Sequence, residues 1–331
     1  MVKIYKMIFL STLFMGTMIS ISSYTWLGTW MGLEINLLSF IPLMKKSKSP
    51  FSSESSMKYF LVQAIASSLF LFSIIMSMIV NNLINETLYV NNLLMFMMNS
   101  TMMLKMGTAP FHFWFPQIIE GMNWNNSMIL MTWQKIAPMM LLSYMMKSIN
   151  LILTVIILST MIGSIGGLNQ TSMRKILAYS SSLLYNEIMW TIYFTIYCII
   201  TISMIILLNK FNIYYLKQLF SSFFSNFFMK MMILFNMLSL GGLPPFLGFL
   251  PKWIIIQYLS SNYSYLILWM ILMTLITLYF YLRITYMSIV LSHNELNYNL
   301  IHFNKNNFLM ILLSFISIYG LIILSFGFNF F

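Results

Sequence analysis

Acidic side chains are nearly absent from this chain of 331 residues, which holds six glutamates and no aspartate. Charged residues make up only 7% of it, against about 25% in a soluble globular domain. Hydrophobic residues make up 60%, and the mean hydropathy is +0.85. This composition excludes an ordinary soluble domain. The net charge of +11 would suggest nucleic-acid binding in a soluble protein, but the apolar runs between the charges favour a membrane topology with no nucleic-acid partner.

Groups that carry redox or metal chemistry are also scarce. Cys198 is the only cysteine, so the chain alone cannot form a disulfide or a cysteine metal site, and we expect this residue to serve packing. No His/Glu spacing is typical of a metal site, and no Gly-rich phosphate loop occurs, so we expect no metal and no cofactor in this chain. The apolar start lacks an A-x-A-like cleavage site, which favours a membrane span over a removed signal.

Long apolar runs fill most of the sequence and predict an all-α polytopic membrane protein with one membrane domain. A span needs about 20 mostly apolar residues. A shorter apolar piece lies at 176–185. The predicted spans lie near residues 4–22, 24–44, 57–80, 92–109, 127–147, 149–168, 190–209, 227–259 (interrupted), 262–290 and 308–330.

Basic residues test the order of these spans. When the N-terminus is placed on the inner side, the basic residues at the polar joints fall on that side, with Lys147 as the exception. For the piece at 176–185, the charge rule and the length of the piece give opposite answers. A crossing there keeps Lys210, Lys217 and Lys230 inside, yet ten residues are too few for a spanning helix. The sequence leaves this conflict open.

Four ionisable residues remain within or against the apolar runs: Glu34, Lys105, Lys135 and Lys252. A charge at the centre of a membrane helix costs roughly 2.5 to 3.5 kcal/mol, and groups kept there usually serve an ion or proton path. Glu34 lies about ten residues into its span, near the middle of a core about 30 Å thick, and Lys105 and Lys135 lie well inside theirs. The alternatives are snorkelling of each lysine to the interface and a protonated, structural carboxyl at Glu34.

Two proline-broken segments lie beside two of these lysines. Residues 107–116 and 241–251 both run from small residues through Pro-Phe and aromatic residues to another proline. Proline breaks a helix, and protein or water must satisfy the freed backbone groups in lipid. Such paired interruptions point to a transport site between repeats, whereas two unrelated kinks are the alternative. His112, in the first segment, is either a proton relay or a structural histidine.

Five motifs around these residues closely resemble one family, the mitochondrially encoded chain 2 subunits of NADH:ubiquinone oxidoreductase (respiratory complex I), which are antiporter-like membrane subunits. The likeness runs over nearly the whole chain, and the 34 methionines fit the mitochondrial code, in which an extra codon reads as Met. The motifs are Trp30-Met31-Gly32-Leu33-Glu34-Ile35-Asn36, Lys105-Met106-Gly107-Thr108-Ala109-Pro110-Phe111-His112, Gln134-Lys135-Ile136-Ala137-Pro138, Arg174-Lys175-Ile176-Leu177-Ala178-Tyr179-Ser180-Ser181 and Gly241-Gly242-Leu243-Pro244-Pro245 with Pro251-Lys252-Trp253.

The resemblance implies about eleven transmembrane helices in antiporter-like inverted repeats with two broken helices. Repeat one would cover about 1–147 and repeat two about 148–290, with a C-terminal helix over about 308–330. The function implied is proton translocation coupled to quinone reduction elsewhere in the complex, with no redox centre in this chain.

The same resemblance assigns roles to the buried charges. Glu34 would be the acidic partner, and Lys105 the lysine of the first broken helix. Lys135 would be the central connecting lysine, and Lys252 would be the exit-side lysine on the second broken helix.

The resemblance also implies surroundings for the chain. It would cross the mitochondrial inner membrane several times, with its N-terminus in the matrix. Its neighbours would be the other complex I subunits, especially chain 4L and chain 4, and membrane lipids, cardiolipin included. NADH, FMN, iron–sulfur clusters and ubiquinone would be bound elsewhere in the complex.

One stretch departs from the family, which usually continues after Ser181 with a segment containing a His and a Gly-Trp. This chain continues with Ser182-Leu183-Leu184 instead, so a helix is truncated there or the sequence omits residues. Two other functions stay open: a free-standing cation/proton antiporter, which shares the fold, and a mainly structural subunit whose charges only couple its neighbours.

Overall fold

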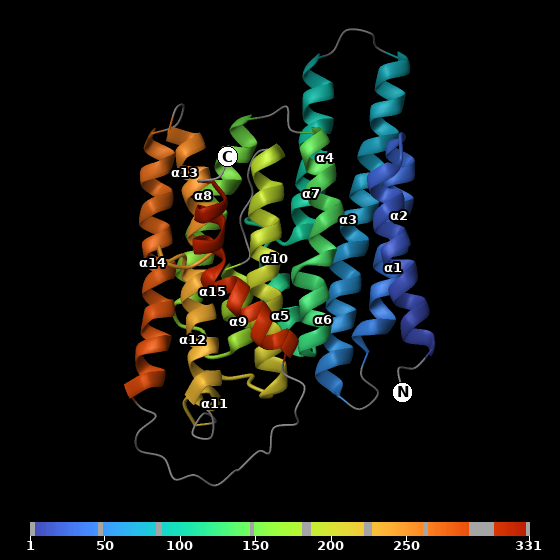
Figure 1. Cartoon of the computed structure of the whole chain (residues 1–331). Helices are drawn as coiled ribbons and strands as arrows, with labels where there is room; N and C mark the ends of the chain where they lie inside the picture. The colour runs from blue at the N-terminus through green and yellow to red at the C-terminus, as the bar shows by residue number, and fades with distance from the viewer. Residues whose placement is uncertain are drawn as a thin grey trace. The chain divides into compact units, whose positions relative to one another are not determined.

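A computed structural model describes residues 4–45, 49–83, 88–145, 149–180, 187–221, 227–260, 264–290 and 308–328. Within these ranges the regular structure is helical, apart from one isolated bridge between Ser172 and Tyr215 (Figure 1). The helices are α1 (Ile4–Ser22), α2 (Trp26–Met44), α3 (Pro50–Leu83), α4 (Leu88–Met106), α5 (Trp114–Gly121), α6 (Trp124–Met131), α7 (Trp133–Met145), α8 (Ile149–Gly167), α9 (Met173–Ser180), α10 (Glu187–Lys210), α11 (Leu216–Ser221), α12 (Phe227–Gly241), α13 (Phe249–Ser260), α14 (Ser264–Val290) and α15 (Phe308–Phe328).

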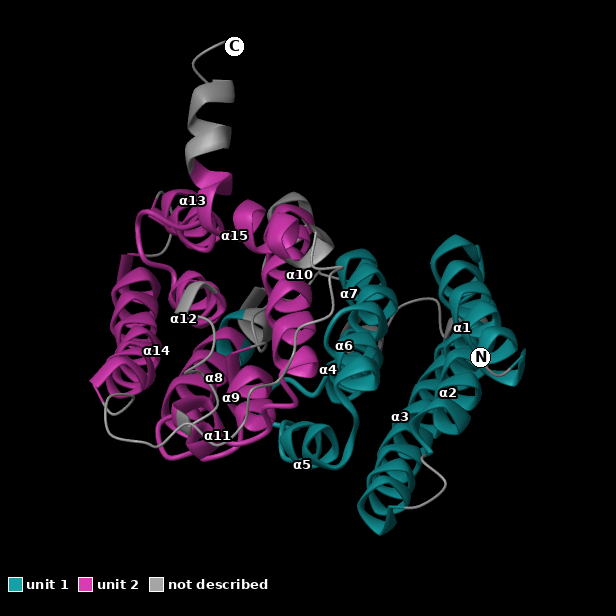
Figure 2. Ribbon diagram, turned by 60° about the horizontal axis from the view of Figure 1, so that its bottom comes forward, with its two compact units in different colours: residues 1–155 teal, residues 156–331 magenta. Residues whose placement is uncertain are grey.

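The chain divides into two compact units, residues 1–155 and residues 156–331 (Figure 2). Unit 1 contains α1 to α7, unit 2 contains α9 to α15, and the sequence of α8 runs across the boundary. This division reflects packing and does not test the inverted repeats, which stay a prediction.

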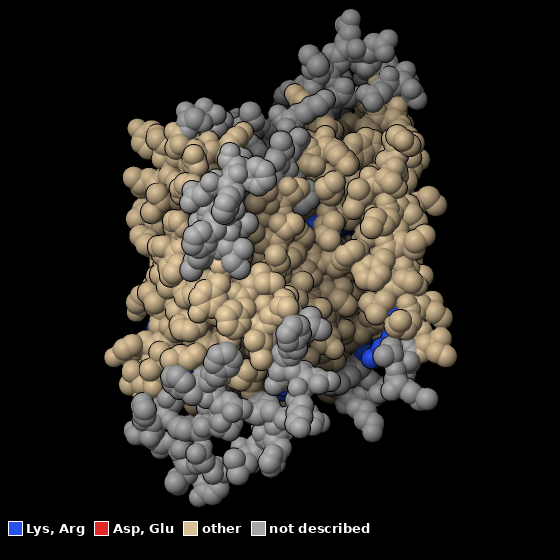
Figure 3. Space-filling view, in the orientation of Figure 1, with Lys and Arg blue, Asp and Glu red and all other residues tan. Residues whose placement is uncertain are grey.

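Five helices within the described residues are long and apolar enough to cross a membrane: α1, α2, α10, α14 and most of α3. Shorter apolar helical stretches cover 153–167, 229–241 and 311–321. On the face that Figure 3 shows, the described surface carries almost no charged side chain. The predicted all-α membrane class is therefore confirmed, and the number of spans stays a prediction.

The helices differ from the predicted spans at two places, and the spans themselves stay a prediction. The span expected over 127–147 consists of α6 and α7, which meet at Thr132. The hydroxyl of Thr132 donates to the carbonyl of Met128 at 2.7 Å, a back-bond that bends helices. The joint expected over 45–56 is partly helical, because α3 begins at Pro50 and proline favours the first position of a helix.

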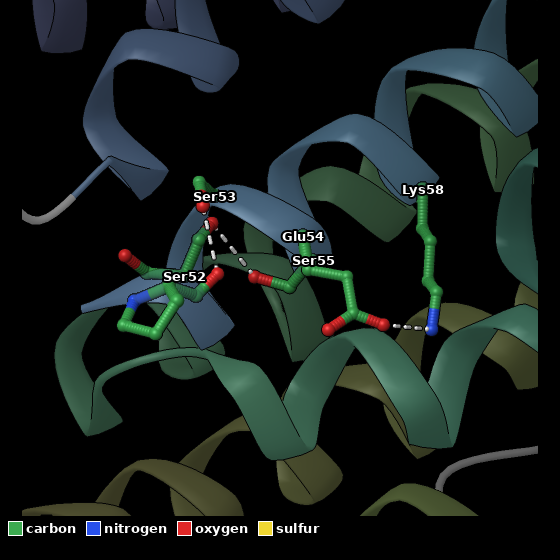
Figure 4. A network of polar contacts seen from close by, with 6 residues as sticks. Ser52, Ser53, Glu54, Ser55 and Lys58 are labelled. Atoms are coloured by element: carbon green, nitrogen blue, oxygen red, sulfur yellow. Dashed lines mark hydrogen bonds and ion pairs between the residues drawn. The ribbon is translucent and has the colours of Figure 1, made fainter.

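The start of α3 is a polar turn whose serines bond to its own backbone (Figure 4). Ser52, Ser53 and Ser55 each donate a hydroxyl to the carbonyl three residues earlier, at 2.7 to 3.0 Å. Glu54 and Lys58 form an exposed ion pair at 2.7 Å. Such a surface pair contributes at most about 1 kcal/mol. Lys58 is therefore a solvated charge, in contrast to the lysines buried in the same unit.

A short antiparallel contact joins the segment after α8 to the segment after α10. Met173 N donates to Tyr214 O at 3.0 Å, and the guanidinium of Arg174 lies 4.8 Å from the centre of the Tyr214 ring. Both segments therefore lie at the same end of unit 2. This placement supports the charge rule, which put their basic residues on one side. The departure from the family at 181–186 lies outside the described residues.

Glycines bring α1 and α2 into close contact. A Cβ atom on Gly32 would lie 2.5 Å from Ser20 N and 2.8 Å from Gly16 O. The side chain of Thr25 caps α2 by accepting a bond from Gly28 N at 3.2 Å. Small residues at such an interface let two backbones approach closely in a membrane protein. The first two helices form a hairpin, and it is packed through Gly16, Ser20 and Gly32.

A methyl group added at this contact should weaken unit 1. We expect Gly32→Ala to lower the free energy of unfolding by about 1–3 kcal/mol, the usual cost of overpacking. Thermal unfolding of the full-length chain in detergent micelles measures the change. Met31→Ala is the control, because the neighbouring Met31 side chain is 58% exposed. Equal destabilisation by the two variants would contradict the close packing of α1 and α2.

Candidate functional site

The first helix break follows Lys105, and nearby protein groups satisfy it. Gly107 has φ +69°, a left-handed conformation that favours glycine, and there the chain leaves α4. The carbonyl of Leu104 accepts a bond from Trp114 Nε1 at 3.1 Å. The carbonyl of Lys105 itself accepts a bond from Gln63 Nε2 on α3 at 3.2 Å. The open end of α4 is thus paired within the protein, as a low-dielectric surrounding requires.

Glu34 and Lys105 form an electrostatically coupled pair. Lys105 is 8% exposed and lies in the last turn of α4. Glu34 on α2 is close enough to attract its ammonium. The Oε2 atom of Glu34 is buried without a hydrogen-bond partner among the described residues. A buried carboxylate oxygen without a donor is costly unless a positive charge or a proton compensates it. The positive charge of Lys105 can supply this compensation.

Lys105 and Lys135 line one small cavity in unit 1. Its volume is about 20 Å³, which is room for about one water molecule. The ammonium of Lys135, a residue only 5% exposed, lies 5.0 Å from the centre of the Phe115 ring, a distance that gives a cation–π attraction. Asn36 and Gln134 also line the cavity, and Gln134 Nε2 donates a hydrogen bond to Asn36 Oδ1 at 2.8 Å. This bond ties α7 to α2 beside the two lysines.

His112 lies in the first break but does not line this cavity. Its ring packs against Phe113 at 4.1 Å between centroids, and its Nδ1 lies 3.3 Å from the carbonyl of Pro110. The cavity therefore brings Lys105 and Lys135 together, and its lining includes neither His112 nor Glu34. Its relay role stays a prediction.

The second break lies between α12 and α13, and Lys252 bonds back across it. Lys252 Nζ donates to Gly241 O at 2.7 Å, which is the carbonyl of the last residue of α12. Gly242 has φ +79°, and a Cβ atom there would lie 2.8 Å from the Cδ atom of Lys252. Glycine is therefore required both by the backbone conformation and by the path of the lysine side chain.

Lys252 also lines a larger cavity in unit 2, of about 70 Å³. This is room for several water molecules. Apolar atoms form most of its wall, and eleven of the lining residues carry a hydroxyl group. These residues are Ser159, Thr160, Ser164, Tyr179, Ser180, Tyr193, Tyr197, Ser239, Thr274, Thr277 and Tyr281. Hydroxyls donate and accept bonds, so this wall can hold water beside the ammonium.

Sequence reasoning misplaced Lys230 at a polar joint. The structure buries this residue to 6% exposure in the first turn of α12 and directs its Nζ to Ser288 O at 2.7 Å. Ser288 lies in the last turn of α14, so the lysine satisfies a carbonyl at a helix C-terminus. The apolar residues that surround Lys230 in the sequence were the available signal. The Asn36–Gln134 bond was missed as well, because 98 residues separate its partners.

No cluster of three or more His, Cys, Asp or Glu side chains that could hold a metal ion occurs in the described part of the chain. Cys198 lies half-buried in α10. The absence of a metal and a cofactor from this chain stays a prediction.

Comparisons with known proteins agree with the fold. The family described as NADH:quinone oxidoreductase/Mrp antiporter, TM, matches residues 23–277. A chain of the structure titled "Respiratory complex I from Thermus thermophilus with bound Aureothin" superposes with a TM-score of 0.83 at 19% identity, covering 96% of this chain and 77% of that one. A chain of the Mrp complex from Dietzia sp. DQ12-45-1b has a TM-score of 0.74 at 16% identity, covering 83% and 59%. At these identities the likeness shows the fold alone.

Sequence identity to named relatives is much higher. NADH-ubiquinone oxidoreductase chain 2 of Anopheles gambiae is 48% identical, over 98% of this chain and 98% of its own length. The same-named protein of Lemur catta is 40% identical, over 90% of this chain and 89% of its own. With this identity over nearly its full length, the chain belongs to the NADH-ubiquinone oxidoreductase chain 2 family, within the NADH:quinone oxidoreductase/Mrp antiporter family.

Proposed function

We propose that this chain is a membrane subunit of a proton-translocating NADH:ubiquinone oxidoreductase and that Glu34, Lys105, Lys135 and Lys252 move protons through it. The observation that carries the proposal is the cavity in unit 1 that Lys105 and Lys135 share. Two lysines beside room for about one water can exchange a proton through that water. The relatives' name supplies the reaction to which the transfer is coupled.

In unit 1 the transfer begins with the coupled pair. While Glu34 is negative, it stabilises the ammonium of Lys105. When Glu34 gains a proton, that attraction is lost and Lys105 gives its proton to the water in the cavity. Lys135 receives it, and the face of the Phe115 ring stabilises the new charge. In the order that the family resemblance implies, Lys252 acts last.

Lys105 and Lys252, the first and last lysines in this order, are each placed at the end of a broken helix. Lys105 lies in the last turn of α4, and Lys252 bonds to the last carbonyl of α12. The C-terminal end of a helix carries partial negative charge, which stabilises a cation by about 0.3–1 kcal/mol, and by up to about 2 kcal/mol where it is partly buried. The ammonium form is thereby held in an apolar surrounding and can still release its proton to a neighbouring water.

The assembly in which this occurs is also part of the proposal. The subunits of the oxidoreductase are its partners, with chain 4L and chain 4 as direct neighbours and cardiolipin among the lipids. NADH, FMN, the iron–sulfur clusters and ubiquinone are bound by other subunits. The chain lies in the mitochondrial inner membrane with its N-terminus in the matrix. The name of its relatives, NADH-ubiquinone oxidoreductase chain 2, supports this location.

A free-standing cation/proton antiporter is the second candidate, because the fold also matches an Mrp complex chain. The identity of 48% to an oxidoreductase subunit, against 16% to the Mrp chain, favours the first candidate. Purification in mild detergent distinguishes them. Co-isolation with subunits that carry FMN and iron–sulfur clusters supports the oxidoreductase, and a cation-transporting chain isolated alone supports the antiporter.

Removal of either unit 1 lysine should interrupt proton transfer. We expect Lys105→Met and Lys135→Met each to lower coupled proton pumping several-fold in the assembled enzyme, because methionine cannot bind the proton. Proton uptake and quinone reduction are measured together in proteoliposomes. Lys58→Met is the matched control, since Lys58 is exposed and paired only on the surface. Unchanged pumping and turnover in both buried-site variants, with normal assembly, would refute the role of these lysines.

Displacement of Lys252 without changing it should have a similar effect. A methyl group at Gly242 would occupy the path of the lysine side chain and would strain a backbone with φ +79°. We expect Gly242→Ala to lower pumping nearly as much as Lys252→Met. Gly241→Ala is the matched comparison and should cause a much smaller loss, because its methyl would meet the Tyr281 ring at an ordinary 3.5 Å. Equal losses at the two glycines would contradict this account.

A further inference from the structure

The break in unit 2 is held from outside by the C-terminal helix α15. The segment 242–248 that joins α12 to α13 makes its other backbone bonds locally. Phe246 N donates to Leu243 O at 3.0 Å, and Leu250 N donates to Leu247 O at 3.2 Å. Leu247 N, by contrast, donates to the carbonyl of Ser317 on α15 at 3.4 Å. This backbone bond ties segment 242–248 to a helix that is distant in the sequence.

Ser317 holds the other side of the break as well. Its hydroxyl lies within hydrogen-bond distance of two acceptors: Oδ1 of Asn236, which lies on α12 just before the break, and the carbonyl of Ser314 on its own helix. Ser317 and Asn236 are both fully buried. One residue of α15 is therefore bonded to the helix before the break through its side chain and to the segment after it through its backbone.

Close packing reinforces the same contact. Gly320 lies one turn after Ser317 on α15, and the space beside it is filled by the side chain of Leu247. Leu247 belongs to a buried cluster with Ile196 and Ile200 of α10. Leu247, and with it segment 242–248, thus packs between α10 and α15, while Ser317 connects this segment to α12.

The geometry that Ser317 maintains is the geometry that Lys252 uses. Lys252 reaches back from α13 to the carbonyl of Gly241 at the end of α12, so the bond exists only while α12 and α13 keep their spacing across the break. We propose that Ser317 is a positioning residue for proton transfer at Lys252: by bonding to Asn236 and Leu247 it fixes the two half-helices so that the ammonium stays between the α12 terminus and the cavity of unit 2. This inference rests on the proposed role of Lys252.

Serine 314 provides a matched control on the same helix. It is also buried, and its hydroxyl donates to its own helix, to Ile311 O at 2.9 Å. We expect Ser317→Ala to lower coupled proton pumping by about two- to tenfold, the factor that one hydrogen bond is worth. Asn236→Ala removes the same bond from the other partner and should behave alike. Ser314→Ala should leave pumping unchanged, and Ser317→Thr, which keeps the hydroxyl, should retain most of it.

A double-mutant cycle in the assembled enzyme separates positioning from general stability. If Ser317 acts through Lys252, then Ser317→Ala adds no further loss of pumping to a Lys252→Met enzyme. Full additivity of the two losses would overturn the proposal, and so would equal losses in Ser317→Ala and Ser314→Ala. Thermal unfolding of each variant verifies assembly. Where Ser317→Ala does not assemble, Asn236→Ala takes its place in the cycle.

Failure of this inference is distinguishable from failure of the proposed function. Normal pumping in Lys252→Met would refute the role of the lysine itself. Impaired pumping in Lys252→Met together with normal pumping in Ser317→Ala and Asn236→Ala would refute only the positioning role.

Discussion

The structure depends on one constraint: a backbone N–H or C=O group surrounded by apolar side chains must find a partner within the protein. Unbroken helices meet this requirement by themselves. The two breaks do not, and each recruits groups from elsewhere. Gln63 and Trp114 satisfy the end of α4, while Lys252 and Ser317 serve the break after α12. The breaks are therefore where distant helices are tied together, and the ionisable residues lie at the same places.

This coincidence has an electrostatic reason. A helix that ends inside an apolar region exposes partial negative charge there, and a lysine is a suitable partner for it. The two lysines lie on opposite sides of their breaks in the sequence. Lys105 precedes its break and lies in the terminal turn of its own helix, whereas Lys252 follows its break and bonds back to the preceding helix. Lys252 thus helps to hold the irregular backbone beside its cavity, whereas Gln63 and Trp114 hold the backbone next to Lys105.

Much of this arrangement could be predicted from the sequence, because it depends on residue types with strong local effects. The apolar runs indicated helices, and proline and glycine marked both breaks. Lys105, Lys135 and Lys252 stood out because a charge within an apolar run is costly. What could not be predicted depends on contacts between distant residues. The bond of Lys230 to Ser288 joins residues that are 58 positions apart in the sequence. The division of the helix at Thr132 accompanies a side-chain bond that apolar periodicity does not reveal.

The sizes of the two cavities have unequal consequences for switching. A cavity of about 20 Å³ has room for about one water molecule, so its water content can change only between one and none. The cavity of about 70 Å³ beside Lys252 has room for several water molecules, so the loss of one leaves room for others. In the proposed proton path, the loss of a single water would therefore matter more between Lys105 and Lys135 than beside Lys252.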